Sequence, residues 1–126
     1  MARILVVDDT SEIRLLLVAV LQRAGHEVIE AADGTSVSSW VDDSHPDLII
    51  LDLMMPGMDG WDTLKQLKSN PETSHIPVII SSALSEDEDL EKARRMGAVD
   101  YISKPWAAAD LIERVRWATI IAKKSA

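Results

Sequence analysis

Three kinds of reactive side chain stand directly behind the apolar stretches of this sequence: carboxylates, hydroxyls and an amine. They are Asp8 and Asp9, Asp52, Ser81 and Ser82, and Lys104. Carboxylates held within several ångström raise each other's pKa and oppose folding, so a cluster of three is costly unless a cation binds there. Mg²⁺ prefers such oxygen ligands. A carboxylate beside this ion, with an amine and a hydroxyl opposite, forms a site that can accept a phosphoryl group.

Asp52 is the predicted acceptor. It ends the apolar run Leu48–Leu51 and precedes a Met-Met-Pro-Gly turn, which leaves room for a donor to approach. In-line attack by its carboxylate places charge on the phosphoryl oxygens, which the metal and Lys104 would neutralise. Taken alone, Asp8 and Asp9 could equally be the cap of the helix that follows them.

Five short apolar runs are predicted to be the strands that position these residues. They lack polar alternation, which is typical of strands buried on both faces of a parallel sheet. The runs are Ile4–Val7, Val28–Ala31, Leu48–Leu51, Val78–Ile80 and Tyr101–Ile102.

Segments of helical periodicity separate the runs. The clearest carries apolar residues from Ile13 to Ala24, with Thr10 or Ser11 as its N-cap and Gly25 as its C-terminal stop. Five strand–helix alternations indicate a doubly wound α/β domain, in which ligands bind at the carboxyl ends of the strands. We therefore expect the reactive side chains to converge on one rim of the sheet. The other helices are predicted at Thr35–Asp43, and at about Trp61–Ser69, Asp87–Met96 and Ala107–Lys123.

Composition excludes several classes of function. The 126 residues suffice for one domain, and a net charge of −8 disfavours nucleic-acid binding by this chain. The sequence has no cysteine for disulfides or thiolate metal sites, and no apolar segment long enough to span a membrane. We expect a cytoplasmic protein without a membrane partner, and the starting Met and short basic tail favour a free-standing regulator. The histidines, predicted to be surface residues, are His26, His45 and His75.

Four separated motifs resemble the receiver domains of two-component response regulators. They are "ILVVDD", "PDLIILDLMMPGMDG", "IPVIISSA" and "GAVDYISKP", and the likeness covers the whole chain. The resemblance implies a single receiver domain over residues 1–126. Its fold would be a flavodoxin-like (βα)5 unit with a five-stranded parallel sheet in the order 2-1-3-4-5.

The resemblance also implies a metal and phosphoacceptor site. Asp52 matches the phosphoacceptor, and Asp9 matches a direct ligand of Mg²⁺, for which Mn²⁺ could substitute. The backbone carbonyl of Met54 would complete the direct protein ligands together with Asp52. Asp8 would hold the metal through water.

The remaining matched residues belong to a switch. Ser82 matches the switch hydroxyl, and Lys104 matches the family's phosphoryl-binding lysine, with Lys104–Pro105 as a cis peptide. Tyr101 matches the aromatic switch residue, which would rotate inward into space that Ser82 vacates. Met54 and Leu84 are apolar where polar side chains can position an attacking water, so the phosphorylated form is expected to last for hours.

The implied function is that of a signalling switch rather than an enzyme. The chain would take a phosphoryl group from a histidine kinase or histidine phosphotransfer protein and control a downstream protein, catalysing only its own phosphorylation and slow dephosphorylation. The alternative is an interaction module that keeps the fold without phosphorylation. Loss of Asp52, Lys104 or the acidic pair would mark such a module, and all are present.

The last predicted helix offers a candidate partner interface. Trp117 and Ile121 lie opposite its predicted core stripe, and exposed aromatic and β-branched groups often mark an interface. A homodimer could form there through the fourth helix, fifth strand and fifth helix, with Trp106 adding to the same face. Alternatively, Trp117 lies flat over its own helix. The predicted core stripe comprises Leu111, Val115, Ala118 and Ala122.

Overall fold

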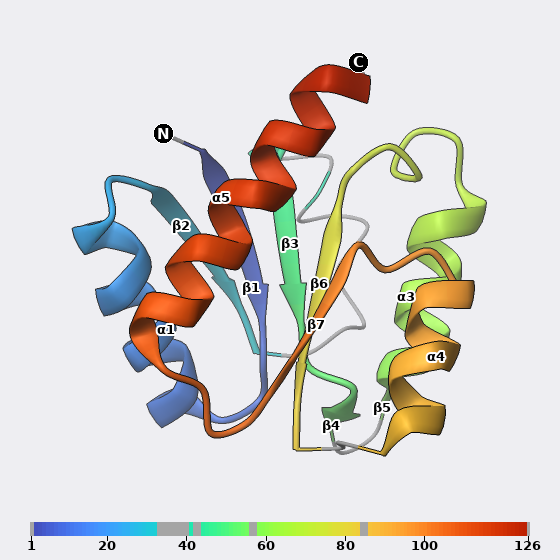
Figure 1. Ribbon diagram of the computed structural model, residues 1–126, viewed down its shortest axis with the longest axis horizontal. Helices are drawn as coiled ribbons and strands as arrows, with labels where there is room; N and C mark the ends of the chain where they lie inside the picture. Colours follow the sequence, from blue (N-terminus) through green and yellow to red (C-terminus); the bar gives the residue numbers. More distant parts are fainter. Residues whose placement is uncertain (1, 33–40, 42–43, 56–57, 84–85, 126) are drawn as a thin grey trace.

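The computed structural model describes residues 2–32, 41, 44–55, 58–83 and 86–125 (Figure 1). Its centre is a five-stranded parallel sheet in the order β2-β1-β3-β6-β7, which is the predicted order 2-1-3-4-5. The predicted doubly wound fold is therefore confirmed. The strands are β1 (Arg3–Val7), β2 (Glu27–Ala31), β3 (Leu48–Leu51), β6 (Val78–Ser82) and β7 (Asp100–Ser103).

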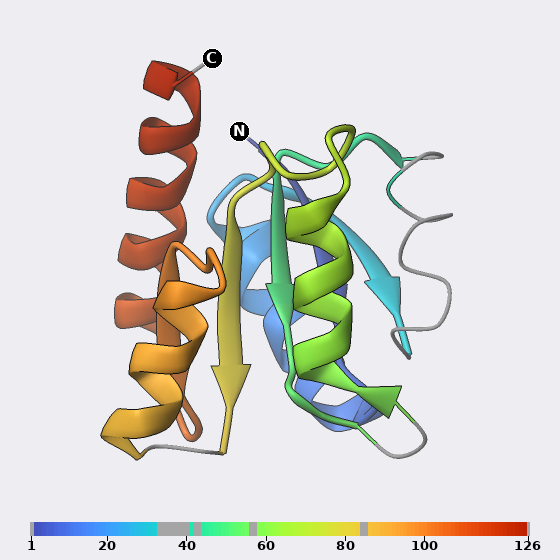
Figure 2. The same cartoon turned by 90° about the vertical axis from the view of Figure 1, so that its right-hand side faces the viewer.

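Helices cover both faces of this sheet (Figures 1 and 2). One face is packed by α1 (Ser11–Arg23) and α5 (Ala108–Ser125), and the other by α3 (Gly60–Ser69) and α4 (Asp87–Arg95). Alternate residues of each strand enter the two cores, as the two-residue period of a strand requires. The predicted helix at Thr35–Asp43 lies, apart from the buried Val41, outside the described residues.

The fourth strand of the sheet, β6, is longer than predicted. The sequence placed Ser81 and Ser82 behind the strand, but both pair with β7 and belong to β6. Backbone hydrogen bonding continues through these residues whatever their side chains, so the polar residues did not mark the end of the strand. Both serines are consequently buried.

The ends of α1 follow the predicted pattern in part. Thr10 occupies the N-cap position, but its side chain makes no capping hydrogen bond. Gly25 ends the helix with a φ of 93°, a left-handed conformation that glycine adopts without a steric penalty.

His26, which follows Gly25, is not the solvated surface residue that was predicted. Its Nδ1 accepts a hydrogen bond from the Ala2 backbone N–H at 3.1 Å. Partial burial lowers the pKa of His26 below its usual value.

A short hairpin that the sequence did not predict joins β3 to α3. It consists of β4 (Met54–Met55) and β5 (Met58–Asp59), which pair antiparallel. Gly60 then begins α3 against the backbone of Leu53, where its N–H donates to the Leu53 carbonyl at 3.2 Å. A Cβ at residue 60 would lie 2.8 Å from the Asp52 carbonyl oxygen, so only glycine fits this approach.

Candidate functional site

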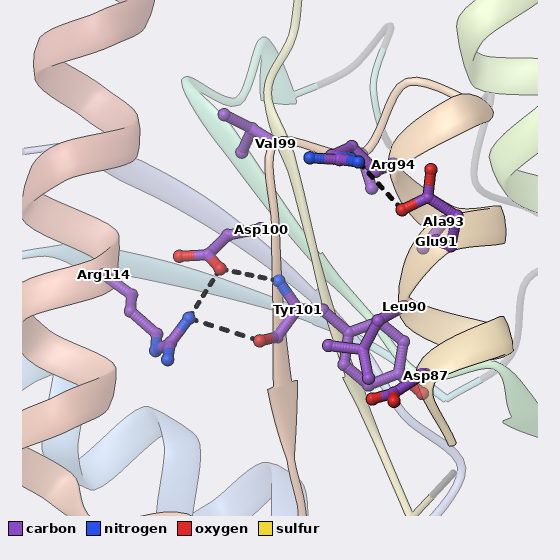
Figure 3. Close-up of a pocket in the computed structure, with 10 residues that line it drawn as sticks. Asp87, Leu90, Glu91, Ala93, Arg94, Val99, Asp100, Tyr101 and Arg114 are labelled. Atoms are coloured by element: carbon purple, nitrogen blue, oxygen red, sulfur yellow. Dashed lines mark hydrogen bonds and ion pairs between the residues drawn. The ribbon is translucent and has the colours of Figure 1, made fainter. Parts of the chain in front are cut away.

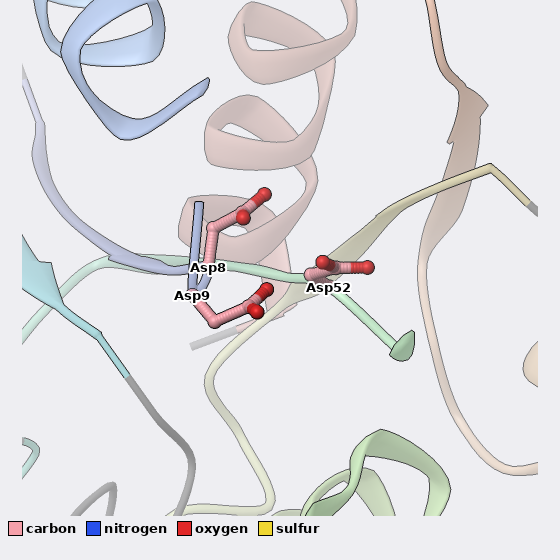
Figure 4. Close-up of side chains that lie close together, drawn as sticks. All are labelled: Asp8, Asp9 and Asp52. Atoms are coloured by element: carbon pink, nitrogen blue, oxygen red, sulfur yellow. The ribbon is translucent and has the colours of Figure 1, made fainter. Parts of the chain in front are cut away.

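Three carboxylates meet at the carboxyl ends of β1 and β3 (Figure 4). One oxygen from each of Asp8, Asp9 and Asp52 lies within 4.8 Å of the others. The backbone holds two of them in place, because the N–H of Asp8 donates to Ala31 and the N–H of Asp52 donates to Val7. Asp8 and Asp52 are buried, whereas Asp9 is exposed.

Lys104 supplies the positive charge in this cluster. Its Nζ lies 2.8 Å from Asp8 Oδ2 and 3.4 Å from Asp52 Oδ2. Only 17% of its side chain is exposed, so solvent screens these ion pairs less than it would on the surface. The Lys104–Pro105 peptide is cis, as the resemblance implied. The predicted convergence of carboxylates and lysine is thus confirmed.

Both oxygens of Asp8 are engaged by the protein. Oδ2 accepts from Lys104, and Oδ1 accepts from the Thr10 backbone N–H at 2.9 Å. This carboxylate is therefore fixed in orientation. The carboxylates of Asp9, which is exposed, and of Asp52, which lies 3.4 Å from Lys104, are better placed to bind a cation directly.

Arg14, which was not among the predicted site residues, supports the same loop. Its Nη1 donates to the carbonyl oxygen of Asp8 at 2.7 Å, and its Nε lies 3.4 Å from Glu30 Oε1. The arginine thereby ties the loop behind β1 to the end of β2. The available signal was a charged residue beside the apolar stripe of the first helix, between Ile13 and Leu17.

Ser82 and Tyr101 form a buried pair on the face of the sheet that α3 and α4 cover. The Ser82 side chain is hydrogen-bonded to the Tyr101 hydroxyl, and Tyr101 is 7% exposed. Burial raises the pKa of Tyr101, with a smaller contribution from the charges of Asp89 and Asp52. The resemblance implied that the tyrosine turns inward only after Ser82 moves. Here it is already inward, held by the core and by Ser82.

The candidate interface residues lie in two different places. Trp117 and Ile121 are 55% and 46% exposed on α5, opposite the buried stripe, as predicted. Trp106 lies elsewhere: it packs against the α1–α5 core and lines a hollow with Ile13 and Leu16 of α1. Trp106 directly follows the turn at Pro105, which directs it toward α1. Of the predicted stripe, Leu111, Val115 and Ala118 are buried, and the Ala122 side chain lies outside the described part.

The donor set fits a hard divalent cation. Three carboxylates face one another at a rim where one of them, Asp9, is open to solvent. Oxygen ligands with access to water are what Mg²⁺ requires, since it retains part of its hydration shell. Thiolate ligands are excluded because the sequence has no cysteine.

Comparison with known proteins identifies the family. Residues 4–116 match the model of the response regulator receiver domain. The chain belongs to this receiver family. The protein PilH of Pseudomonas aeruginosa is 36% identical over 91% of this chain and 95% of its own length. The structure of the chemotaxis protein CheY4 of Vibrio cholerae superposes with a TM-score of 0.87 at 29% identity, covering 94% of this chain and 98% of that one.

Other relatives are longer than this receiver domain. The phosphate regulon transcriptional regulatory protein PhoB of Escherichia coli is 40% identical over 90% of this chain, which spans only 50% of PhoB. Receiver domains are signalling switches rather than enzymes; they typically bind Mg²⁺ at an acidic pocket and interact with histidine kinases and downstream effectors. Within the part of this receiver that the structure describes, every helix is too short or too polar to cross a bilayer.

Proposed function

We propose that Asp52 accepts a phosphoryl group from a histidine kinase or a histidine phosphotransfer protein in the cytoplasm. The observation that carries this proposal is the position of Lys104, which lies between the buried carboxylates of Asp8 and Asp52. A buried aspartate beside a lysine and two further carboxylates is costly as a purely structural arrangement. In a site that accepts a phosphoryl group, the aspartate, the lysine and the two further carboxylates would each have a chemical role.

The transfer requires one bond to form and one to break. A carboxylate oxygen of Asp52 attacks phosphorus as the bond from phosphorus to the donor's imidazole nitrogen breaks, and the electron pair leaves with that nitrogen. The product is an acyl phosphate on Asp52. The ammonium of Lys104 is close enough to move from Asp52 to a phosphoryl oxygen and neutralise its charge.

The acidic cluster would hold Mg²⁺, or Mn²⁺ in its place. Asp9 and Asp52 are the proposed direct ligands together with the backbone carbonyl of Met54. Asp8, whose two oxygens are already engaged, would contribute through water. When bound, the ion neutralises charge on the transferring phosphoryl group.

Ser82 is the proposed link from the phosphoryl group to the surface. A hydrogen bond from its hydroxyl to a phosphoryl oxygen would compete with its present bond to Tyr101. Helix α4, next to β7, has only one buried side chain, Ala93, so few core contacts oppose its displacement. The surface formed by α4, β7 and α5 would then control a downstream protein or a second copy of the chain through Trp117 and Ile121.

Intact mass spectrometry tests this function. The wild type and Asp52→Asn are incubated with acetyl phosphate, once with Mg²⁺ and once with EDTA. We expect the mass of one phosphoryl group only in the wild type with Mg²⁺. An unmodified wild type in every condition would contradict the proposal and favour an interaction module that does not use phosphorylation.

A further inference from the structure

We propose that Ser81 is a positioning residue for Asp52, through a hydrogen bond from its hydroxyl to the Asp52 carboxylate, made directly or through one buried water. The inference rests on the proposed function and adds a residue to that site. The role differs from that of Ser82, because adjacent residues of a strand point to opposite faces of the sheet.

The register of the sheet sets Ser81 beside Asp52. Leu51 of β3 pairs with Ile80 of β6, so the next residues on the two strands, Asp52 and Ser81, are neighbours as well. Adjacent strands lie about 4.8 Å apart, which is within reach of a serine hydroxyl and a carboxylate. The same register sets Asp8 on the other side of Asp52, since Val7 pairs with Leu51.

Both side chains also point to the same face. Leu51 and Ile80 belong to the core under α3 and α4, so the residues that follow them face α1 and α5. Leu53 again belongs to the core under α3 and α4, so Asp52, which lies between Leu51 and Leu53, points to the opposite face. Ser81 therefore lies on the carboxylate side of the sheet, whereas Ser82 lies on the tyrosine side.

Lys104 must pass over Ser81 to reach its partners. It follows β7, and β6 separates β7 from β3 and β1 in the sheet. Its Nζ nevertheless contacts Asp8 and Asp52, so its stem crosses the end of β6, where Ser81 is located. The register of the strands therefore puts the Ser81 hydroxyl close to the longer, 3.4 Å ion pair between Lys104 and Asp52.

The Ser81 hydroxyl is available for such a bond. Ser81 is 1% exposed, and among the described residues its Oγ has no hydrogen-bond partner. Leaving a buried hydroxyl unsatisfied is destabilising, so an apolar residue would stabilise this position better unless the hydroxyl has a polar partner. Rotation about its Cα–Cβ bond gives the hydroxyl three staggered positions from which to donate toward Asp52 or a water beside it.

A matched set of variants tests this role. Ser81→Ala removes the hydroxyl, and Ser81→Thr keeps it. Thr63→Val is the control, because Thr63 Oγ1 is the other buried oxygen without a partner in the described part, and it lies on α3 across the sheet. Each variant is labelled with acetyl phosphate and Mg²⁺ while intact mass is followed in time, and its urea midpoint is measured in EDTA.

We expect Ser81→Ala to be phosphorylated roughly three- to tenfold more slowly than the wild type, the effect of one hydrogen bond. Because the same hydrogen bond is lost in the metal-free protein, its urea midpoint should be unchanged or slightly lower, while Ser81→Thr and Thr63→Val keep the wild-type rate. A rate for Ser81→Ala within about twofold of the wild type would overturn the inference, and so would an equal loss in Ser81→Thr. A wild type that takes no label would instead overturn the proposed function itself, and this inference with it.

Discussion

At the scale of single residues, charge compensation governs the site. Three carboxylates share one rim, and Lys104 is the cation that contacts two of them. Arg14 adds a second positive charge but reaches only the backbone carbonyl of Asp8. The metal-free site therefore carries excess negative charge, and its stability depends on Lys104.

Lys104→Met should destabilise the metal-free protein by about 3 kcal/mol, because it leaves the buried carboxylates of Asp8 and Asp52 without their shared partner. Mg²⁺ should restore more stability to this variant than to the wild type, since the ion would supply the missing positive charge. Urea unfolding in EDTA and in Mg²⁺ measures both effects. Lys65→Met, on the exposed side of α3, is the control and should change stability by less than about 0.5 kcal/mol. Equal midpoints for Lys104→Met and the wild type in EDTA would contradict this account.

Sequence alone predicted the carboxylates and Lys104 because each directly follows a strand, and parallel strands end at one rim. Arg14, Trp106 and the inward Tyr101 were missed or misplaced for a common reason. Their positions depend on contacts between segments far apart in the chain, and local spacing contains no information about those contacts. The locations of site residues at strand ends are thus easier to predict from sequence than the locations of the side chains that contact them.

At the scale of elements, continuous apolar runs made the five strands predictable, and helical periodicity did the same for α1, α3, α4 and α5. The hairpin of β4 and β5 escaped prediction because a two-residue strand is too short to show a period. Polar serines were wrongly interpreted as the end of β6. The hairpin matters to function, because it lies between Asp52 and the start of α3.

Gly60→Ala should disturb the site through this connection. A methyl group at residue 60 would meet the Leu53 carbonyl oxygen at 2.7 Å, so the backbone behind Asp52 has to shift. We expect a loss of about 1–3 kcal/mol in the free energy of unfolding, together with slower labelling by acetyl phosphate. Both are measured by urea unfolding and intact mass.

The control for Gly60→Ala is Gly25→Ala. Gly25 has a φ of 93° but open space around its Cβ position, so alanine there strains the backbone without touching the site. It should lose stability, by about 1 kcal/mol, and keep the wild-type labelling rate. Unchanged labelling in a folded Gly60→Ala would show that the contact with Leu53 does not position Asp52.

At the scale of the whole molecule, the two ends of the proposed switch lie on different surfaces. The carboxylates occupy the rim of the sheet, whereas the proposed output surface is formed by α4, β7 and α5. Arg114 links α5 to β7 within that surface, because it donates to Asp100 at 2.6 Å and to the Tyr101 carbonyl oxygen at 3.3 Å (Figure 3). Tyr101 itself reaches toward Ser82. A displacement of Tyr101 would therefore disturb the hydrogen bonds that Arg114 of α5 makes to β7.

Trp117→Glu should weaken self-association of the phosphorylated protein by about thirtyfold, because tryptophan is enriched among interface hot spots, whose loss costs about 2 kcal/mol or more. Sedimentation velocity over a concentration series, with acetyl phosphate and Mg²⁺, measures the change. The wild type should sediment faster with increasing concentration, and more so at higher salt, since each copy carries a net charge of −8. Leu15→Glu is the matched control, because Leu15 is 71% exposed on α1, away from the proposed interface. If Trp117→Glu associates like the wild type, or if Leu15→Glu weakens association equally, α5 is not the interface.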